Sequence, residues 1–257
     1  PLLSAANEAP FSASAPDGSL EERHPWTDKP LLNERSDFQF VVVTDRTGGH
    51  RDGVFEQAVS KINLLRPEFV VSVGDLVEGY YDDPIQSVRE WTEFDGMVDA
   101  LDMRFFYVPG NHDIWSPFSR EVWEERFGSS YYHFIYRDVL FLALNSEDGA
   151  STTIGQEQAR YFVEVLEAHP EVRWTLVFTH KPLWYYDERG SETGWASIQD
   201  QLVGRPHTVF AGHRHQYIHY EREGMRYIDL ATTGGGSSLA GPAHGRFDHF
   251  VWVTMTQ

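Results

Sequence analysis

The sequence contains no cysteine, which excludes disulfides, thiolate metal sites and cysteine nucleophiles together. It also lacks any run approaching the roughly 18 apolar residues that a membrane span needs, so no membrane span is expected. Basic residues are scarce, because 21 Lys and Arg stand against 39 Asp and Glu and give a net charge of −18. Long nucleic acids and anionic membranes are polyanions, so this charge argues against a protein that coats either of them.

The composition is otherwise that of a globular protein, with 41% hydrophobic and 23% charged residues among 257. Residues 1–36 show no sustained apolar period and are expected to form an N-terminal extension on the surface, anchored by side chains such as Trp26. No linker interrupts residues 37–257, which are expected to form one α/β domain. The chain starts at Pro1 and not at Met, which favours an exported protein, periplasmic or extracellular, whose leader was removed; a trimmed chain would look the same.

Strand and helix patterns alternate after residue 37. Apolar runs at 38–44, 69–73 and 105–108 predict strands, and the segments between them, 52–66 and 84–101, have helical spacing. This β-α-β-α-β order is typical of parallel strands with helical crossovers. The second half is richer in strands, with a hairpin predicted around residues 137–138, a helix at 156–168, and strands at 174–179, 208–211, 216–221, 226–230 and 247–254.

Metal-ligand residue types stand where five of these strands end. Because the carboxyl ends of strands in α/β sheets converge, these side chains are expected at one edge. The residues in question are Asp45, Asp75, the run Asn111-His112-Asp113, His180, and the pair His213 and His215.

The chemistry of this set is that of a transition-metal site. Carboxylate oxygen, amide oxygen and imidazole suit Mn, Fe or Zn, whereas Ca²⁺ prefers a shell made of oxygen alone. A carboxylate such as Asp75 can bridge two ions, and two ions about 4 Å apart can activate water and hold a phosphoryl group.

The order Asp, Gly-Asp, Gly-Asn-His-Asp, His, Gly-His-x-His resembles the calcineurin-like metallophosphoesterase superfamily, from residue 38 to about residue 254. The resemblance implies a four-layer α/β/β/α sandwich of two mixed sheets, with residues 37–257 as the catalytic domain. By this resemblance, one metal site has Asp45 and His215, Asp75 bridges to a second ion, and the second site is completed by Asn111, His180 and His213. It further implies that His112 is the catalytic imidazole and that a metal-bridging hydroxide is the nucleophile.

The sequence departs from the family in its first motif. The usual Asp-x-His is replaced by Asp45-Arg46-Thr47, so one site lacks a ligand, as it does in purple acid phosphatases. His50 could reach back, Glu78 could supply a carboxylate, or water could fill the gap. Glu78 is favoured for another role, because phosphoprotein phosphatases have an aspartate there that orients the catalytic histidine.

Two further features lie beside these motifs. Arg46 could bind a phosphate oxygen, or it could form a salt bridge with one of the many carboxylates. Aromatic residues follow several motifs and could form a substrate wall or pack in the core: Tyr80, Tyr81, Trp115, Trp184, Tyr185 and Tyr186.

The sequence therefore predicts a metal-dependent phosphoric ester hydrolase with two divalent or trivalent ions, acting on a small phosphate ester. One alternative is a phosphodiesterase acting on nucleotides or phospholipid headgroups. An alternative of another class is a degenerate, non-catalytic metal-binding domain. The oligomeric state is left open.

Overall fold

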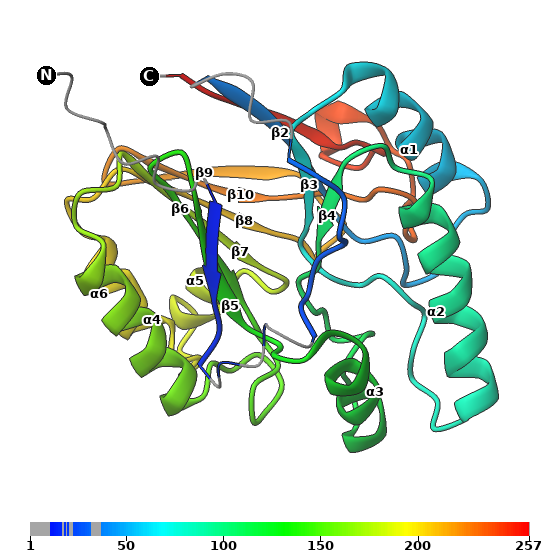
Figure 1. Cartoon of the computed structure of the whole chain (residues 1–257), viewed down its shortest axis with the longest axis horizontal. Coiled ribbons are helices and arrows are strands. Elements are labelled where there is room, and N and C mark those ends of the chain that lie inside the picture. Colours follow the sequence, from blue (N-terminus) through cyan, green and yellow to red (C-terminus); the bar gives the residue numbers. More distant parts are fainter. Residues whose placement is uncertain (1–10, 17, 19, 21–22, 32–36, 257) are drawn as a thin grey trace, which may run out of the picture.

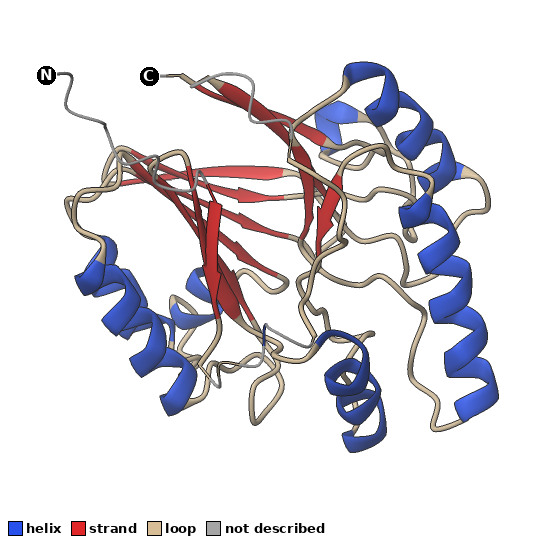
Figure 2. Ribbon diagram, in the orientation of Figure 1, coloured by secondary structure: helices blue, strands red, loops and turns tan. Residues whose placement is uncertain are grey.

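Two β-sheets pack face to face, and helices cover both outer faces (Figures 1 and 2). The computed structural model describes residues 11–16, 18, 20, 23–31 and 37–256. Both sheets are mixed, and the layers run helix, sheet, sheet, helix. The predicted α/β/β/α sandwich is confirmed.

The larger sheet has seven strands in the order β1-β5-β6-β7-β8-β10-β9. Its centre, β6 to β7 to β8 to β10, is parallel, and the pairs at both margins are antiparallel. The predicted hairpin joins β5 to β6 through Arg137 and Asp138, whose φ angles of 49° and 59° are those of a tight turn that matches the twist of the strands. The bounds are β1 Phe11–Ser14, β5 Tyr132–Tyr136, β6 Val139–Leu144, β7 Trp174–Thr179, β8 His207–Ala211, β9 Ile218–Arg222 and β10 Met225–Asp229.

The smaller sheet has four strands in the order β11-β2-β3-β4. Strands β2, β3 and β4 are parallel, and β11 joins β2 antiparallel, so the end of the described chain returns to the first predicted strand. The bounds are β2 Phe38–Val43, β3 Phe69–Ser72, β4 Arg104–Phe106 and β11 Val251–Met255.

Helices pack on the outer faces through apolar stripes. On α1, Phe55, Ala58, Val59 and Ile62 are buried at helical spacing. Proline stands at the first turn of both α2 and α3, where its missing N–H costs nothing. Helices α1, α2 and α3 lie beside the smaller sheet, and α4, α5 and α6 beside the larger one (Figure 1). Their bounds are α1 Val54–Leu65, α2 Pro84–Asp99, α3 Pro117–Phe127, α4 Gln156–Ala168, α5 Leu183–Asp187 and α6 Trp195–Leu202.

The core between the sheets is built on aromatic rings. Phe134 stacks between Phe106 of the smaller sheet and Phe141 of its own sheet, with ring centroids 4.2 and 4.4 Å away. Such rings bury large apolar areas, and the stack joins the two sheets directly.

The described part of the N-terminal segment pairs with both sheets. Strand β1 lies antiparallel to β5, and Trp26 forms a bridge with Phe106 of β4. The indole also contacts the rings of Phe11 and Tyr132. These residues therefore add to the sheets, which a surface extension anchored by single side chains does not describe. The boundary between an extension and a catalytic domain at residue 36 stays a prediction.

Strand β1 and helices α3, α5 and α6 were not predicted from the sequence. Helix α3 had a readable signal, because Ser116 accepts a hydrogen bond from the Ser119 amide and Pro117 follows it. Helix α5 is only five residues long, and α6 begins after Gly194 without a side-chain cap.

A matched pair of leucine substitutions tests the core. Leu176 is 1% exposed between the sheets, whereas Leu64 on α1 is 84% exposed. We expect Leu176→Ala to lower the free energy of unfolding by about 2–5 kcal/mol and Leu64→Ala to change it by less than about 0.5 kcal/mol, both measured by urea unfolding. Equal losses would contradict the description of this core.

The pH dependence of stability provides a second test. Burial, together with the neighbouring His169, lowers the pKa of His133 to about 4 from the usual 6.5. The unfolded chain therefore takes up this proton more readily, and stability is lost as the pH falls from about 6.5 towards 4. We expect the free energy of unfolding to fall less over this pH range in His133→Gln than in the wild type. Urea unfolding at several pH values measures this. Exposed His219→Gln is the control, and the wild-type slope in His133→Gln would contradict the assignment.

Candidate metal centre

The predicted polar side chains meet where the carboxyl ends of both sheets come together. Asp45 follows β2 and Asp75 follows β3, both in the smaller sheet. His180 directly follows β7, and His213 and His215 follow β8, in the larger sheet. The site therefore lies across the junction of the two sheets, as expected for strand ends that converge.

Two groups of ligand atoms share one carboxylate. Asp75, His180 and His213 form one group, and Asp45, Asp75 and His215 form the other; within each, the ligand atoms lie within 4.8 Å of one another. The Asp75 Oδ2 atom is 3.2 Å from His180 Nε2, and Asp45 Oδ1 is 3.2 Å from His215 Nε2. Asp75 is thus the residue common to both halves of the site.

Asn111 joins the first group through its amide. Its Oδ1 atom is 3.0 Å from His180 Nε2, and its Nδ2 atom donates to the Tyr80 hydroxyl at 2.7 Å. The amide oxygen therefore faces the His180 imidazole of the group.

Two glycines permit the close approach of the loops. A Cβ atom at Gly212 would lie 2.3 Å from Asp45 Oδ2, and one at Gly110 would lie 2.2 Å from Asp75 Oδ1. No other residue type fits at these distances, so the glycines of the Gly-Asn-His-Asp and Gly-His-x-His motifs make room for the carboxylates.

Three predicted ligands have left-handed backbone conformations. The φ angles of Asp75, His213 and His215 are 57°, 71° and 49°. Such conformations cost of order 1–3 kcal/mol each and persist where the surroundings hold them. Here the His213 amide donates to both carboxylate oxygens of Asp45, at 2.9 and 3.2 Å, which holds one loop against the other.

Asp113 holds the loop that carries Asp75, a role that the sequence analysis did not assign. Its buried carboxylate accepts hydrogen bonds from the main-chain N–H groups of Asp75, Leu76, Val77 and Gly110, at 2.8–3.1 Å. Burial and the nearby Asp75 carboxylate raise the pKa of Asp113 to about 7, and the N–H donors act in the opposite direction. The last residue of the Gly-Asn-His-Asp motif is therefore structural.

The charges at the site are strongly coupled. Burial opposes ionisation of Asp75, but His180 outweighs it and holds the pKa of Asp75 below its usual range. Burial likewise disfavours the charged form of His180, yet the Asp75 carboxylate raises the pKa of this imidazole to about 9. Burial, with the neighbouring His180, lowers the pKa of His213 to about 3. The Asp75 carboxylate and the His180 imidazole therefore each stabilise the charged form of the other.

His112 is oriented by the main chain. Its Nδ1 atom donates to the carbonyl oxygen of Glu78, and its Nε2 atom is 3.9 Å from Asp75 Oδ2. The Glu78 carboxylate points elsewhere, to the amides of Gly49 and His50. The main-chain carbonyl of Glu78, and not the predicted carboxylate, therefore orients the His112 ring. The carboxylate instead accepts hydrogen bonds from the main chain at residues 49–50.

His50 and Arg46 lie outside both ligand groups. His50 Nδ1 is 2.8 Å from the Glu78 carboxylate and its Nε2 is 3.3 Å from Asp52, so both ring nitrogens face carboxylates outside the two ligand groups. Buried Arg46 donates to the Leu76 carbonyl and pairs with Glu93. These contacts agree with the interpretation of Arg46 as a member of an ion pair. A chain with 39 Asp and Glu residues provides a partner for this guanidinium within the protein.

Two ion pairs that were not predicted from the sequence adjoin the ligands, one of them buried and the other with a half-buried arginine. Lys181 Nζ lies 2.7 Å from Glu147, and Arg214 Nη1 lies 3.0 Å from Asp229. Both basic residues directly follow a predicted ligand in the chain, so these pairs fix the loops on which His180 and His213 stand.

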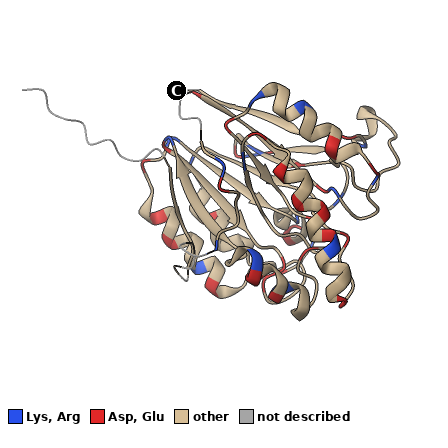
Figure 3. Ribbon diagram, turned by 45° about the vertical axis from the view of Figure 1, so that its right-hand side comes forward, with Lys and Arg blue, Asp and Glu red and all other residues tan. Residues whose placement is uncertain are grey.

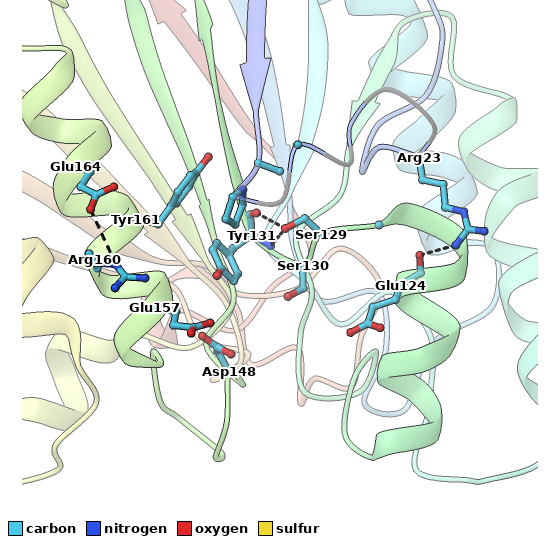
Figure 4. A pocket seen from close by; sticks show the side chains of 14 residues that line it. Arg23, Glu124, Ser129, Ser130, Tyr131, Asp148, Glu157, Arg160, Tyr161 and Glu164 are labelled. Carbon is cyan, nitrogen blue, oxygen red and sulfur yellow. Dashed lines mark hydrogen bonds and ion pairs between the residues drawn. The ribbon is translucent and has the colours of Figure 1, made fainter.

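A cavity of about 1230 Å³ lies apart from this centre, between α3 and α4 (Figure 4). Its wall includes Glu124, Tyr131, Asp148, Arg160 and Tyr161, and none of the predicted ligands. The Arg160 guanidinium pairs with Glu164 on the same helix, and Arg23 donates to the Glu124 carbonyl. The predicted ligands lie at the carboxyl ends of the strands and not in this cavity.

The donor set suits transition-metal cations. Two carboxylates, three imidazoles and one amide oxygen converge, and most of these residues are buried. The five candidates His180, His213, His215, Asp45 and Asp75 supply the type of ligand that Mn, Fe and Zn take.

The chain belongs to the calcineurin-like phosphoesterase family, whose sequence model matches residues 36–217. The predicted class, a metal-dependent phosphoesterase, is confirmed by this membership. Among the described residues, every helix is too short or too polar to cross a bilayer.

Curated relatives include serine/threonine-protein phosphatase CPPED1 of several mammals. The chain is 28% identical to the Homo sapiens protein over 183 residues, which are 63% of this chain and 58% of that protein. It is 28% identical to the Mus musculus protein over 229 residues, 77% of this chain and 73% of that one. The match therefore spans less than two thirds of the human relative.

Solved structures share the fold. A dimetal phosphatase from Danio rerio superposes with a TM-score of 0.58 at 16% identity, covering 77% of this chain and 88% of that one. A purple acid phosphatase from yellow lupin (Lupinus luteus) superposes with a TM-score of 0.64 at 16% identity, covering 88% and 51%. At such identities the likeness concerns the fold alone.

Removal of the shared carboxylate tests the centre. We expect Asp75→Asn to weaken Mn²⁺ binding by more than the roughly 10–100-fold that loss of an outer partner costs, because both ligand groups lose a charged member. Calorimetric titration of metal-free protein measures this. Asp200→Asn on the exposed face of α6 is the control, and unchanged Mn²⁺ affinity in Asp75→Asn would contradict the assignment.

Proposed function

We propose that the protein is a dinuclear metal-dependent phosphoesterase that hydrolyses a small phosphate ester. The observation that carries this proposal is the sharing of Asp75 between two groups of ligand atoms, which gives a place for two cations and not one. Asp45, His215 and Asp75 would hold one ion, and Asp75, Asn111, His180 and His213 the other. His50 is left out, because both of its ring nitrogens face other carboxylates.

Bound there, the cations would supply the positive charge that holds the phosphoryl group and the activated water that attacks it. The residues of the chain would hold these cations and orient the groups around them. Asp113 fixes the main chain of Asp75 and of the two residues after it, together with Gly110, through four N–H groups, so the shared carboxylate is held before substrate arrives.

His112 is proposed to act on the leaving group. Its Nδ1–H donates to the Glu78 carbonyl, which fixes the ring and turns Nε2 toward the Asp75 edge of the site. From there Nε2 would give a proton to the leaving oxygen, or stabilise the charge that develops on it.

The acidic surface favours a small substrate. Asp and Glu residues recur along the outer helices, consistent with the net charge of −18 (Figure 3). A long polyanion would be repelled by this surface, whereas a small ester needs only the local positive charge of two bound cations.

A phosphomonoester is the favoured substrate class. The mammalian relatives are named serine/threonine-protein phosphatases, and a phosphorylated hydroxyl side chain is a phosphomonoester. A phosphodiester of nucleotide or phospholipid type is the alternative. Turnover of nitrophenyl phosphate against bis-nitrophenyl phosphate separates the two, and a preference for the diester would contradict the monoester proposal.

Export of the protein stays a prediction.

The catalytic role of His112 has a distinct signature. We expect His112→Ala to lower kcat for nitrophenyl phosphate by roughly 10²–10⁴-fold while Mn²⁺ affinity is kept, because the imidazole is proposed to move a proton and not to hold an ion. Kinetics and calorimetry on the same sample measure both.

The control is His244→Ala, which removes an exposed imidazole. Wild-type kcat in His112→Ala would contradict the role of this residue. A wild-type protein that binds Mn²⁺ yet hydrolyses neither ester would favour the degenerate, non-catalytic alternative.

A further inference from the structure

Tyr80 touches two predicted site residues at once. Its hydroxyl accepts a hydrogen bond from Asn111 Nδ2 at 2.7 Å. Its ring stands edge-on to the His112 ring, with centroids 4.5 Å apart and planes 74° apart, and lies 5.5 Å from the Trp115 ring. The side chain therefore contacts the metal centre from its rim, although the residue is 54% exposed.

The conformation of Tyr80 is held by the loop around it. Its φ angle is 59°, a left-handed backbone that costs a bulky residue free energy. A Cβ atom at the preceding Gly79 would lie 1.9 Å from the His112 carbonyl oxygen, so the loop passes directly against the His112 main chain. The Glu90 carboxylate accepts from the Glu78 amide at 3.0 Å and fixes the loop from the other side.

The amide of Asn111 has two ends of similar size and opposite chemistry. Its oxygen can serve as a ligand to a cation, whereas its NH₂ group is a donor and cannot. In the structure Oδ1 is 3.0 Å from His180 Nε2, and Nδ2 faces away, to Tyr80. A hydroxyl that accepts from the NH₂ group therefore decides which end faces the ligand group.

We infer that Tyr80 is a positioning residue of the metal centre, whose hydroxyl orients the Asn111 amide so that its oxygen faces the cation. The inference rests on the ion site of the proposed function. It assigns no ligand role to Tyr80 itself, because its hydroxyl is engaged with the amide nitrogen. Partners of this kind commonly change metal affinity by about 10–100-fold when they are removed.

Tyr80→Phe tests this, because it removes the hydroxyl and keeps the ring against His112. We expect the Kd for Mn²⁺ to rise about tenfold, with an unchanged melting temperature, in titrations of metal-free full-length protein. The matched control is Tyr81→Phe, which removes a neighbouring hydroxyl that donates to Glu90 at 2.6 Å and contacts no predicted ligand. An unchanged Kd in Tyr80→Phe, or an equal rise in Tyr81→Phe, would overturn the inference.

A double substitution separates orientation from general loosening of the loop. In Asn111→Asp both ends of the side chain are oxygen, so its orientation no longer decides what faces the cation. We expect Tyr80→Phe to change the Kd for Mn²⁺ by less than about twofold in the Asn111→Asp background, against about tenfold in the wild-type background. The same loss in both backgrounds would overturn the inference.

These titrations also distinguish this inference from the proposed function. Suppose that the wild-type protein binds Mn²⁺ but hydrolyses neither ester, and that Tyr80→Phe binds Mn²⁺ more weakly. This result would support the inference and contradict the proposed function. A wild-type protein that binds no Mn²⁺ overturns the inference, because the amide would then have no cation to face.

Discussion

The contact between the two sheets at Asp45 and Asp75 is the constraint on which the site depends. The His213 amide reaches from the larger sheet to the Asp45 carboxylate of the smaller one. His180 reaches across in the same way to Asp75. The first contact requires that a loop of the larger sheet approach Asp45 more closely than a side chain normally allows, which is why Gly212 stands there. Within the smaller sheet, Gly110 makes room for Asp75 in the same way. The aromatic stack between the sheets holds the two layers in the register that this contact needs.

The site combines strain with buried charge, and the surrounding polar network offsets both. Left-handed backbone at Asp75, His213, His215 and Tyr80 and several buried carboxylates would destabilise an isolated loop. Main-chain N–H groups aimed at Asp113 lessen the cost of that buried charge. A site so fixed in advance is suited to holding cations at set positions.

The sequence predicted the architecture and the meeting of the site residues, but not the contacts of each side chain. Motif order and the ends of apolar runs were enough to bring Asp45, Asp75, His180, His213 and His215 together, because parallel strands converge at one edge. The partners of the Glu78 side chain differed from the prediction, and the carboxylate that pairs with Arg46 could not be named, since the direction of a loop side chain depends on tertiary neighbours such as Glu93. Strand β1 was missed because a four-residue edge strand is stabilised by pairing with β5 and has little pattern of its own.

The most direct test of the account is an experimental structure of the protein crystallised with Mn²⁺, with anomalous diffraction measured at the manganese edge. The account predicts two anomalous peaks about 3.5–4 Å apart, one on each side of the Asp75 carboxylate, with the Asn111 oxygen facing one of them. A single peak, or two peaks that do not share Asp75, would contradict it.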